Sequence, residues 1–105
     1  MKRLVSEVKA MVTVELINAN KDFPMFRSTH EGYAIIKEEV EEAEIEMKSV
    51  KCNLEYSWEL IKNNVSALGL VKQMQNKATL LAAESIQTAA MCQKFIDSEL
   101  SEVNK

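Results

Sequence analysis

Residues that break helices are scarce in this chain, and this scarcity limits the folds open to it more than any other feature. The sequence contains two glycines and one proline among 105 residues. Folds built from many short strands need frequent turns, and glycine and proline supply most of them. So few of these residues favour long helices joined by few connections. We therefore predict an all-α protein.

Apolar residues recur at helical spacing in the first part of the chain. One such stretch predicts a helix from about residue 3 to about residue 19, ended by Asn20 and Pro24. The connecting residues Phe23, Met25 and Phe26 are expected to pack on the remaining helices. The segment Ser28-Thr29-His30-Glu31 has the spacing of a capping box and predicts the start of the next helix.

Two further apolar stripes complete the pattern. The second predicted helix runs from residue 30 to about residue 64, either unbroken or as two helices with a break near residues 51–53. A last helix is expected from about residue 70 to about residue 99. Three residues are expected to stop the second helix: Asn63, Asn64 and Gly69. Long helices with short connections predict an antiparallel helical bundle.

Composition and charge narrow the class of protein. The length suits one helical domain over residues 1–105, and 47% hydrophobic against 28% charged residues is a globular composition. A formal net charge of -3 gives no reason to expect nucleic acid as a partner, because phosphate backbones call for a clustered basic face. Charged residues near the N-terminus argue against a signal peptide or a membrane span. Cys52 and Cys92 fit neither a disulfide framework nor a zinc site, so a cytoplasmic setting is expected.

Acidic side chains gather on one flank of the second predicted helix. Successive residues of an α-helix are rotated by about 100°, which places Glu39, Glu42 and Glu46 beside the apolar stripe. The same rotation places Glu38 further from the stripe. Carboxylates one turn apart repel each other unless a cation lies between them. Hard divalent ions such as Mg²⁺ take oxygen ligands and bind phosphate oxygens at their remaining positions. The pattern therefore indicates a metal site that acts on phosphates.

The last predicted helix carries a carboxylate among apolar residues. Glu84 and Gln87 share a side of this helix with Leu80, Met91 and Phe95. A lone carboxylate is costly to bury there, so Glu84 needs a partner, which the acidic flank and a metal ion would supply. The helix is apolar on most sides and rich in alanine, which lets a neighbouring helix approach closely. We expect self-association into a dimer or tetramer to complete the bundle.

The order of these segments resembles a known enzyme family. His30-Glu31-Gly32-Tyr33-Ala34 leads into Glu38-Glu39-Val40-Glu41-Glu42, and Glu84-Ser85-Ile86-Gln87 follows on a later helix. An E-E-x-x-E segment before an E-x-x-D segment resembles the MazG-like all-α nucleoside triphosphate pyrophosphohydrolases. Over roughly residues 26–97 the chain looks most like the small phage-associated MazG-like proteins. The resemblance implies a helical bundle, often dimeric or larger. It also implies that Mg²⁺ serves to cleave a nucleoside triphosphate into a monophosphate and pyrophosphate.

The resemblance also assigns residues. By position it implies metal ligands at Glu38, Glu39, Glu42, Glu84 and Gln87, with Mg²⁺ as the ion and Mn²⁺ as a substitute. Glu38 or Glu39 would accept the proton of the attacking water. Gln87 stands where the family usually has aspartate. A neutral amide oxygen still coordinates metal but removes one negative charge, so weaker Mg²⁺ binding is expected. The gap between Glu42 and Glu84 is also longer than in compact members of the family.

Structural interpretations compete with these roles. The acidic flank is also typical of a solvated helix face beside lysines. Trp58 is most simply a core or interface anchor, and His30 has no second histidine or cysteine nearby with which to bind zinc. Candidates for phosphate contacts are the lysines Lys37, Lys48, Lys77 and Lys94. The competing function is a catalytically degenerate MazG-like homo-oligomer that acts as a nucleotide sensor or a protein-interaction scaffold. A helical adaptor that binds only another protein is a third alternative.

Overall fold

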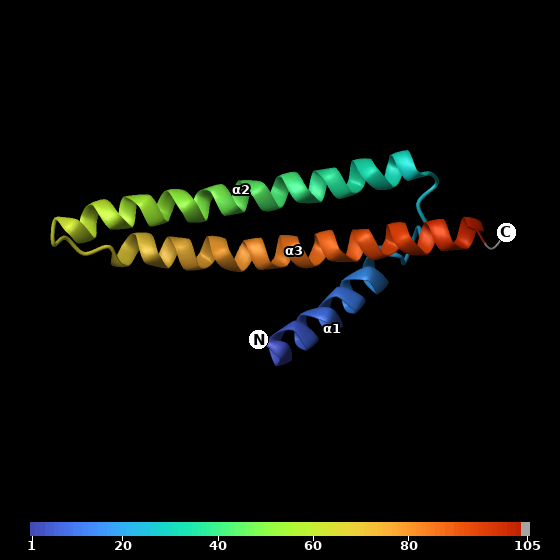
Figure 1. The fold of residues 1–105 in the computed structure, drawn as a ribbon, viewed down its shortest axis with the longest axis horizontal. Coiled ribbons are helices and arrows are strands. Elements are labelled where there is room, and N and C mark those ends of the chain that lie inside the picture. The colour runs from blue at the N-terminus through green and yellow to red at the C-terminus, as the bar shows by residue number, and fades with distance from the viewer. Residues whose placement is uncertain (104–105) are drawn as a thin grey trace.

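The chain folds into three helices. A computed structural model describes the backbone of residues 1–103 and the side chains of residues 1–99. The helices are α1 (Lys2–Ala19), α2 (Thr29–Lys62) and α3 (Leu68–Val103), and the described residues contain no strand. The all-α class predicted from the scarcity of glycine and proline is therefore confirmed. Helices α2 and α3 form a long antiparallel hairpin, and the shorter α1 packs obliquely on α3 near the open end of the hairpin (Figure 1).

Helix α2 is a single helix of 34 residues, which answers the question that the apolar pattern left open. Its only glycine is Gly32, in the first turn, and it contains no proline. Nothing in residues 51–53 therefore interrupts the i to i+4 hydrogen bonds of the backbone. The unbroken helix places the acidic flank and the far end of the hairpin on one rigid element.

The turn from α2 to α3 is made by asparagine. Asn64 has a positive φ of 57°. Its N–H donates to the Ile61 carbonyl at 3.0 Å, and the Val65 N–H donates to the Leu60 carbonyl at 2.9 Å. These two bonds form a Schellman motif, which satisfies the last carbonyl groups of a helix and reverses the chain. Asparagine takes the left-handed position here because its short polar side chain tolerates positive φ better than most residues.

The predicted helix limits compare well with the observed ones, with one error. Helix α1 lies within one residue of its predicted limits, and α2 ends at Asn63 and Asn64 as expected. The expectation that Gly69 belongs to the stop signal is wrong, because Gly69 lies in the first turn of α3. Helix α3 begins at Leu68 and continues to Val103, so it is longer than predicted at both ends. The Schellman motif already reverses the chain, so no second breaker is needed.

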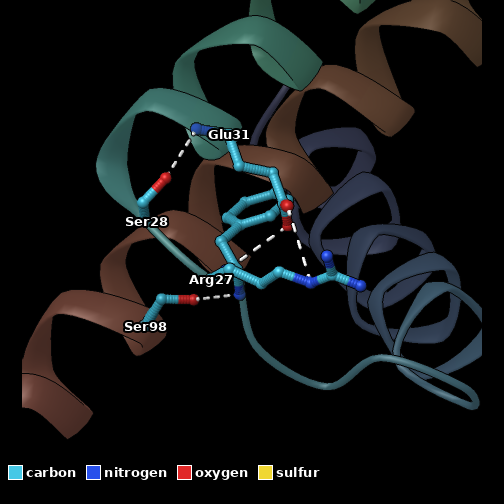
Figure 2. Close-up of polar contacts among 5 residues, drawn as sticks. Arg27, Ser28, Glu31 and Ser98 are labelled. Carbon is cyan, nitrogen blue, oxygen red and sulfur yellow. Dashed lines mark hydrogen bonds and ion pairs between the residues drawn. The ribbon is translucent and has the colours of Figure 1, made fainter.

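The capping box at the start of α2 is present in a modified form. Ser28 Oγ accepts a hydrogen bond from the Glu31 backbone N–H at 3.1 Å, as predicted. The Glu31 carboxylate accepts from the Arg27 backbone N–H at 3.3 Å and lies 4.0 Å from the Arg27 guanidinium (Figure 2). A capping box would direct it to Ser28, one residue later. The positive guanidinium and the N–H of Arg27 together attract the carboxylate instead.

The connection between α1 and α2 is attached to α3 through the hydroxyl of Ser98. The Phe26 backbone N–H donates to Ser98 Oγ at 2.9 Å (Figure 2). Of the three apolar residues expected to pack here, Phe26 is half-buried, whereas Phe23 and Met25 are 65% and 44% exposed. The Ser98 hydroxyl also lies 3.7 Å from Met25 Sδ, to which it can donate a weak hydrogen bond. The connection is therefore held at two adjacent residues, next to the start of α2.

Small residues are buried where helices α2 and α3 pack together. A Cβ built on Gly32 would lie 2.5 Å from Cδ2 of Phe95, so the Phe95 ring occupies the space that any larger residue would need. Ala90 is fully buried, and Ser57 is 2% exposed with its hydroxyl bonded to the Asn53 carbonyl. The core is therefore a narrow seam between two helices, and no large side chain of the described residues is fully buried.

The molecule is elongated and leaves much apolar surface exposed. Its principal extents are 65 × 30 × 21 Å, and its accessible surface is 7972 Å². A folded monomer of 11.9 kDa exposes about 6,000 Å². The far end of the hairpin, which α1 does not reach, carries exposed large side chains: Leu54, Trp58, Ile61, Val65, Leu68 and Val71. None of the helices in the described part of the chain is apolar over a length sufficient to cross a membrane.

Candidate metal centre

Three carboxylates converge at the seam between α2 and α3. Glu39 and Glu42 come from α2 and Glu84 comes from α3, and one oxygen atom of each lies within 4.8 Å of the others. Glu39 and Glu42 are three residues apart, so they project from the same face of α2 toward α3. All three side chains are half-buried. We define these three residues, together with Gln87, as the carboxylate group.

Gln87 lies one turn beyond Glu84 on the same face of α3. With its nitrogen turned toward the carboxylates, the amide donates from Nε2 to Oε2 of Glu39 and to Oε2 of Glu84, at 3.2 Å each. The opposite orientation places the amide oxygen against two carboxylate oxygens, which is favourable only when a cation lies between them. The amide therefore offers the carboxylate group either hydrogen-bond donors or one more oxygen ligand.

The electrostatics of the group show mutual repulsion. Burial raises the pKa of Glu84 above its ordinary value, and a hydrogen bond with Glu42 and the charges of Glu42, Glu39 and Glu46 raise it further. The pKa of Glu39 is raised by burial first, and then by the charges of Glu42, Glu38 and Glu15. In both cases the cause is loss of hydration followed by like charge. A bound cation would remove this repulsion.

Two other glutamates of the predicted flank lie outside the carboxylate group. Glu38 is exposed on α2, next to Glu39, and its charge acts on Glu39 through space. Glu46 is half-buried and forms an ion pair with Lys77 at 3.7 Å, and its buried Oε2 accepts no hydrogen bond from the described residues. The structure thus brings together four of the five predicted metal ligands and leaves Glu38 at the edge.

Glu15 of α1 was not anticipated from the sequence. Its charge contributes to the raised pKa of Glu39, so α1 brings a further acidic residue to the carboxylate group. The helical pattern places Glu15 on α1 but gives no information on where α1 packs. The crossing of α1 over α3 is set by tertiary contacts, which no local signal in the sequence describes.

A groove between α1 and α3 opens beside the carboxylate group. It has a volume of about 610 Å³. Its lining is mostly apolar, with two acidic side chains and Gln87 at its edge: Glu7, Ala10, Met11, Val14, Glu15, Ala83, Ile86 and Gln87. A ligand held at the carboxylate group would have apolar surface next to it, as ligand sites commonly provide.

The basic and imidazole side chains named from the sequence are dispersed. Lys37 pairs with Glu41 at 3.7 Å on the surface of α2, and Lys48 is exposed. His30 is exposed in the first turn of α2, more than two turns before Glu39. Lys94 is buried on α3, two turns after Gln87. Among these residues, none was found within the carboxylate group.

The donor atoms of the carboxylate group determine which ions it suits. All of them are carboxylate or amide oxygens, which match Mg²⁺, Mn²⁺ or Ca²⁺. Zinc and copper favour imidazole or thiolate, which this group lacks, and Cys52 and Cys92 are free and exposed. The residues present therefore fit the Mg²⁺ that the family resemblance implies.

Comparison with protein-family models, curated proteins and solved structures finds no match to the chain. The resemblance to MazG-like enzymes rests on the E-E-x-x-E segment and on Glu84, and it stays a prediction. The functional interpretation therefore rests on the geometry of the carboxylate group.

Proposed function

We propose that this protein is a MazG-like, Mg²⁺-dependent nucleoside triphosphate pyrophosphohydrolase. The observation that carries the proposal is the convergence of Glu39, Glu42 and Glu84 from two helices to within 4.8 Å. Carboxylates at this separation repel each other, and a divalent cation is the ligand that best relieves the repulsion. The same residues occupy the positions at which the family resemblance expects metal ligands.

In the proposed reaction, the carboxylate group would bind the metal ion and Glu38 would act as the base. Glu39, Glu42 and Glu84 would hold the ion, with the Gln87 amide turned so that its oxygen faces it. When bound, Mg²⁺ supplies positive charge that neutralises phosphate oxygens and acidifies a water molecule. Glu38 is exposed beside the group and is free to accept the proton of that water. The adjoining groove beside Gln87 would receive the nucleoside part of the substrate.

We also propose that the active form is a dimer or tetramer in the cytoplasm. The chain exposes 7972 Å², about 2,000 Å² more than a folded monomer of its mass. Obligate homodimers bury about 2,000 to 5,000 Å² in total, so the excess on two chains suffices for an interface of this class. The reducing environment of the cytoplasm agrees with two free, exposed cysteines.

The direct test is product analysis. Purified protein is incubated with each common ribo- and deoxynucleoside triphosphate and Mg²⁺, and monophosphate and pyrophosphate are measured separately. We expect equal amounts of the two products from at least one nucleotide, and none from the Glu84→Gln variant. Release of inorganic phosphate with diphosphate would indicate a phosphatase instead. An absence of any product would contradict the enzymatic function.

The second candidate is a catalytically degenerate homo-oligomer, which acts as a nucleotide sensor or a protein-interaction scaffold. Gln87 favours it, because an amide at the aspartate position lowers the negative charge that holds Mg²⁺. The exposed apolar end of the hairpin supports it as well. Nucleotide binding without turnover would favour this candidate.

A further inference from the structure

Lys94 is a buried cation without an acidic partner among the described side chains. The residue is 7% exposed, and its Nζ lies 4.9 Å from the centroid of the Phe26 ring. Among residues 1–99, no carboxylate forms an ion pair with it. The stem of the side chain is buried, the Nζ is not among the buried polar atoms, and the aromatic ring face compensates part of the ammonium charge. The Lys94 ammonium is therefore open to an anion from solution.

A second cation lies on the same cavity. Arg27 and Lys94 both line a pocket of about 510 Å³ beneath the connection between α1 and α2. The Arg27 side chain is 81% exposed and extends from the connection toward α1 (Figure 2). Its ion pair with Glu31 is long, at 4.0 Å, so most of its hydrogen-bond donors stay available. The pocket thus combines one buried and one exposed cation against a single carboxylate.

We propose that this pocket binds a phosphate group between Lys94 and Arg27. Proteins commonly bind phosphate with guanidinium and ammonium groups, and Arg27 and Lys94 supply one of each to this pocket. The N-terminus of α2, which carries a partial positive charge, begins two residues after Arg27. Phe26 and its hydrogen bond to Ser98 fix the connection that carries Arg27.

The phosphate pocket is separate from the carboxylate group. Lys94 lies seven positions after Gln87 on α3, which corresponds to two turns or about 10 Å along the helix axis. None of the residues that line the pocket belongs to the carboxylate group. Phosphate should therefore bind here without any divalent ion, and this independence allows the two sites to be tested separately.

Inorganic phosphate is the probe, titrated into the full-length protein in buffer that contains EDTA. We expect a saturable rise in melting temperature beyond that produced by chloride at equal ionic strength, since a ligand of the folded state stabilises it. Amide chemical-shift changes should concentrate in residues 26–31 and 91–95. Lys94→Met retains the apolar stem and removes the charge, so phosphate should bind at least tenfold more weakly. Lys72→Met removes an exposed lysine of α3 that does not line the pocket, and it should bind phosphate as the wild type does.

The outcomes separate the proposal from its alternatives. A phosphate shift that is unchanged in Lys94→Met, or shift changes centred on Glu39 and Glu84, would overturn it. So would a wild-type response no larger than that to chloride. If Lys94→Met does not fold, Arg27→Gln on the exposed connection replaces it, with weaker phosphate binding expected and unchanged binding overturning the proposal. Because no divalent ion is present, neither result depends on the proposed enzymatic activity.

Discussion

Gln87 is the residue on which the chemistry of the carboxylate group depends most. Its amide lies 3.2 Å from both Glu39 and Glu84, so it donates hydrogen bonds when no cation is bound. Turning the amide by half a rotation would present its oxygen to an ion instead. A metal ion bound as we propose would therefore meet one neutral ligand, where a fourth carboxylate would bind the metal more strongly but repel its neighbours more.

Replacing Gln87 tests this balance. We expect Gln87→Asp to tighten Mg²⁺ binding and to preserve or raise hydrolysis, because it restores a negative charge to the ligand set. Glu39→Gln and Glu84→Gln should abolish hydrolysis and weaken Mg²⁺ binding by at least about tenfold. Calorimetric titration and turnover on the same variants measure both effects. If both glutamine variants bind Mg²⁺ as the wild type does, these residues are not ligands.

The raised pKa values of Glu39 and Glu84 predict how stability depends on pH. A group whose pKa is higher in the folded than in the unfolded chain favours folding at low pH, and this contribution is lost as pH rises through the folded value. In EDTA, Glu84→Gln should therefore be more stable than the wild type at neutral pH. The difference should vanish near pH 4, where unfolded glutamate is itself largely protonated. Urea unfolding at both pH values measures it, and an equal difference at the two would contradict the prediction.

The sequence gives unequal information on the residues of this group. The i, i+3 spacing of Glu39 and Glu42, and the apolar neighbours of Glu84, predict which faces of the two helices meet. The orientation of the Gln87 amide and the approach of Glu15 were not predictable, because both depend on how α1 and α3 pack. The role of these side chains as metal ligands stays a prediction.

Helix α2 shows how local signals determine an element. Ser28 at its start and Asn63 and Asn64 at its end set limits that the sequence predicts, because caps act through neighbouring backbone groups. Whether its middle was broken could not be predicted from the weak polar run near residue 52. The prediction that Gly69 helps to stop α2 was wrong because glycine near a turn ends a helix only where the backbone needs a positive φ. Here Asn64 takes the positive φ, and Gly69 lies inside α3.

Substitution of Asn64 tests the Schellman motif. Asn64→Ala should destabilise the protein by about 1 kcal/mol, because alanine is strained at a φ of 57°, whereas Asn64→Gly should be neutral or stabilising. Chemical denaturation of both variants provides the comparison. The matched control is the pair Asn63→Ala and Asn63→Gly: both lose the hydrogen bond from Asn63 Nδ2 to the Glu59 carbonyl at 2.8 Å, but a φ of -99° gives glycine no advantage over alanine. Equal stability of the Asn64 alanine and glycine variants would exclude strain at this position.

The whole molecule is elongated, and its apolar side chains are unusually exposed. Its radius of gyration is 18.0 Å, whereas a compact domain of this length has about 13 Å. The hairpin has cover from α1 over only part of its length, and the apolar side chains at its far end face solvent. The apolar surround of α3 predicts self-association from the sequence, and the exposed apolar surface agrees with that prediction, which stays untested; neither indicates which surfaces meet.

Self-association is measurable directly. Light scattering at micromolar concentration should give the mass of a dimer or larger, because the accessible surface of the chain exceeds that of a folded monomer of its mass. Trp58→Glu at the far end of the hairpin should shift the mass toward the monomer, since it places a charge in the proposed contact. Lys51→Glu, at an exposed polar position on the same helix, should leave the mass unchanged. A monomeric wild-type protein would contradict the proposal.

Binding of a divalent ion to the carboxylate group is the central claim, and Mn²⁺ titration followed by electron paramagnetic resonance tests it most directly. We expect loss of the free Mn²⁺ signal in proportion to protein, competition by Mg²⁺, and a rise in melting temperature with either ion. Glu84→Gln should lose both effects, because it removes one of the three converging carboxylates. Undiminished free Mn²⁺ signal at millimolar ion, or wild-type binding by Glu84→Gln, would contradict the claim.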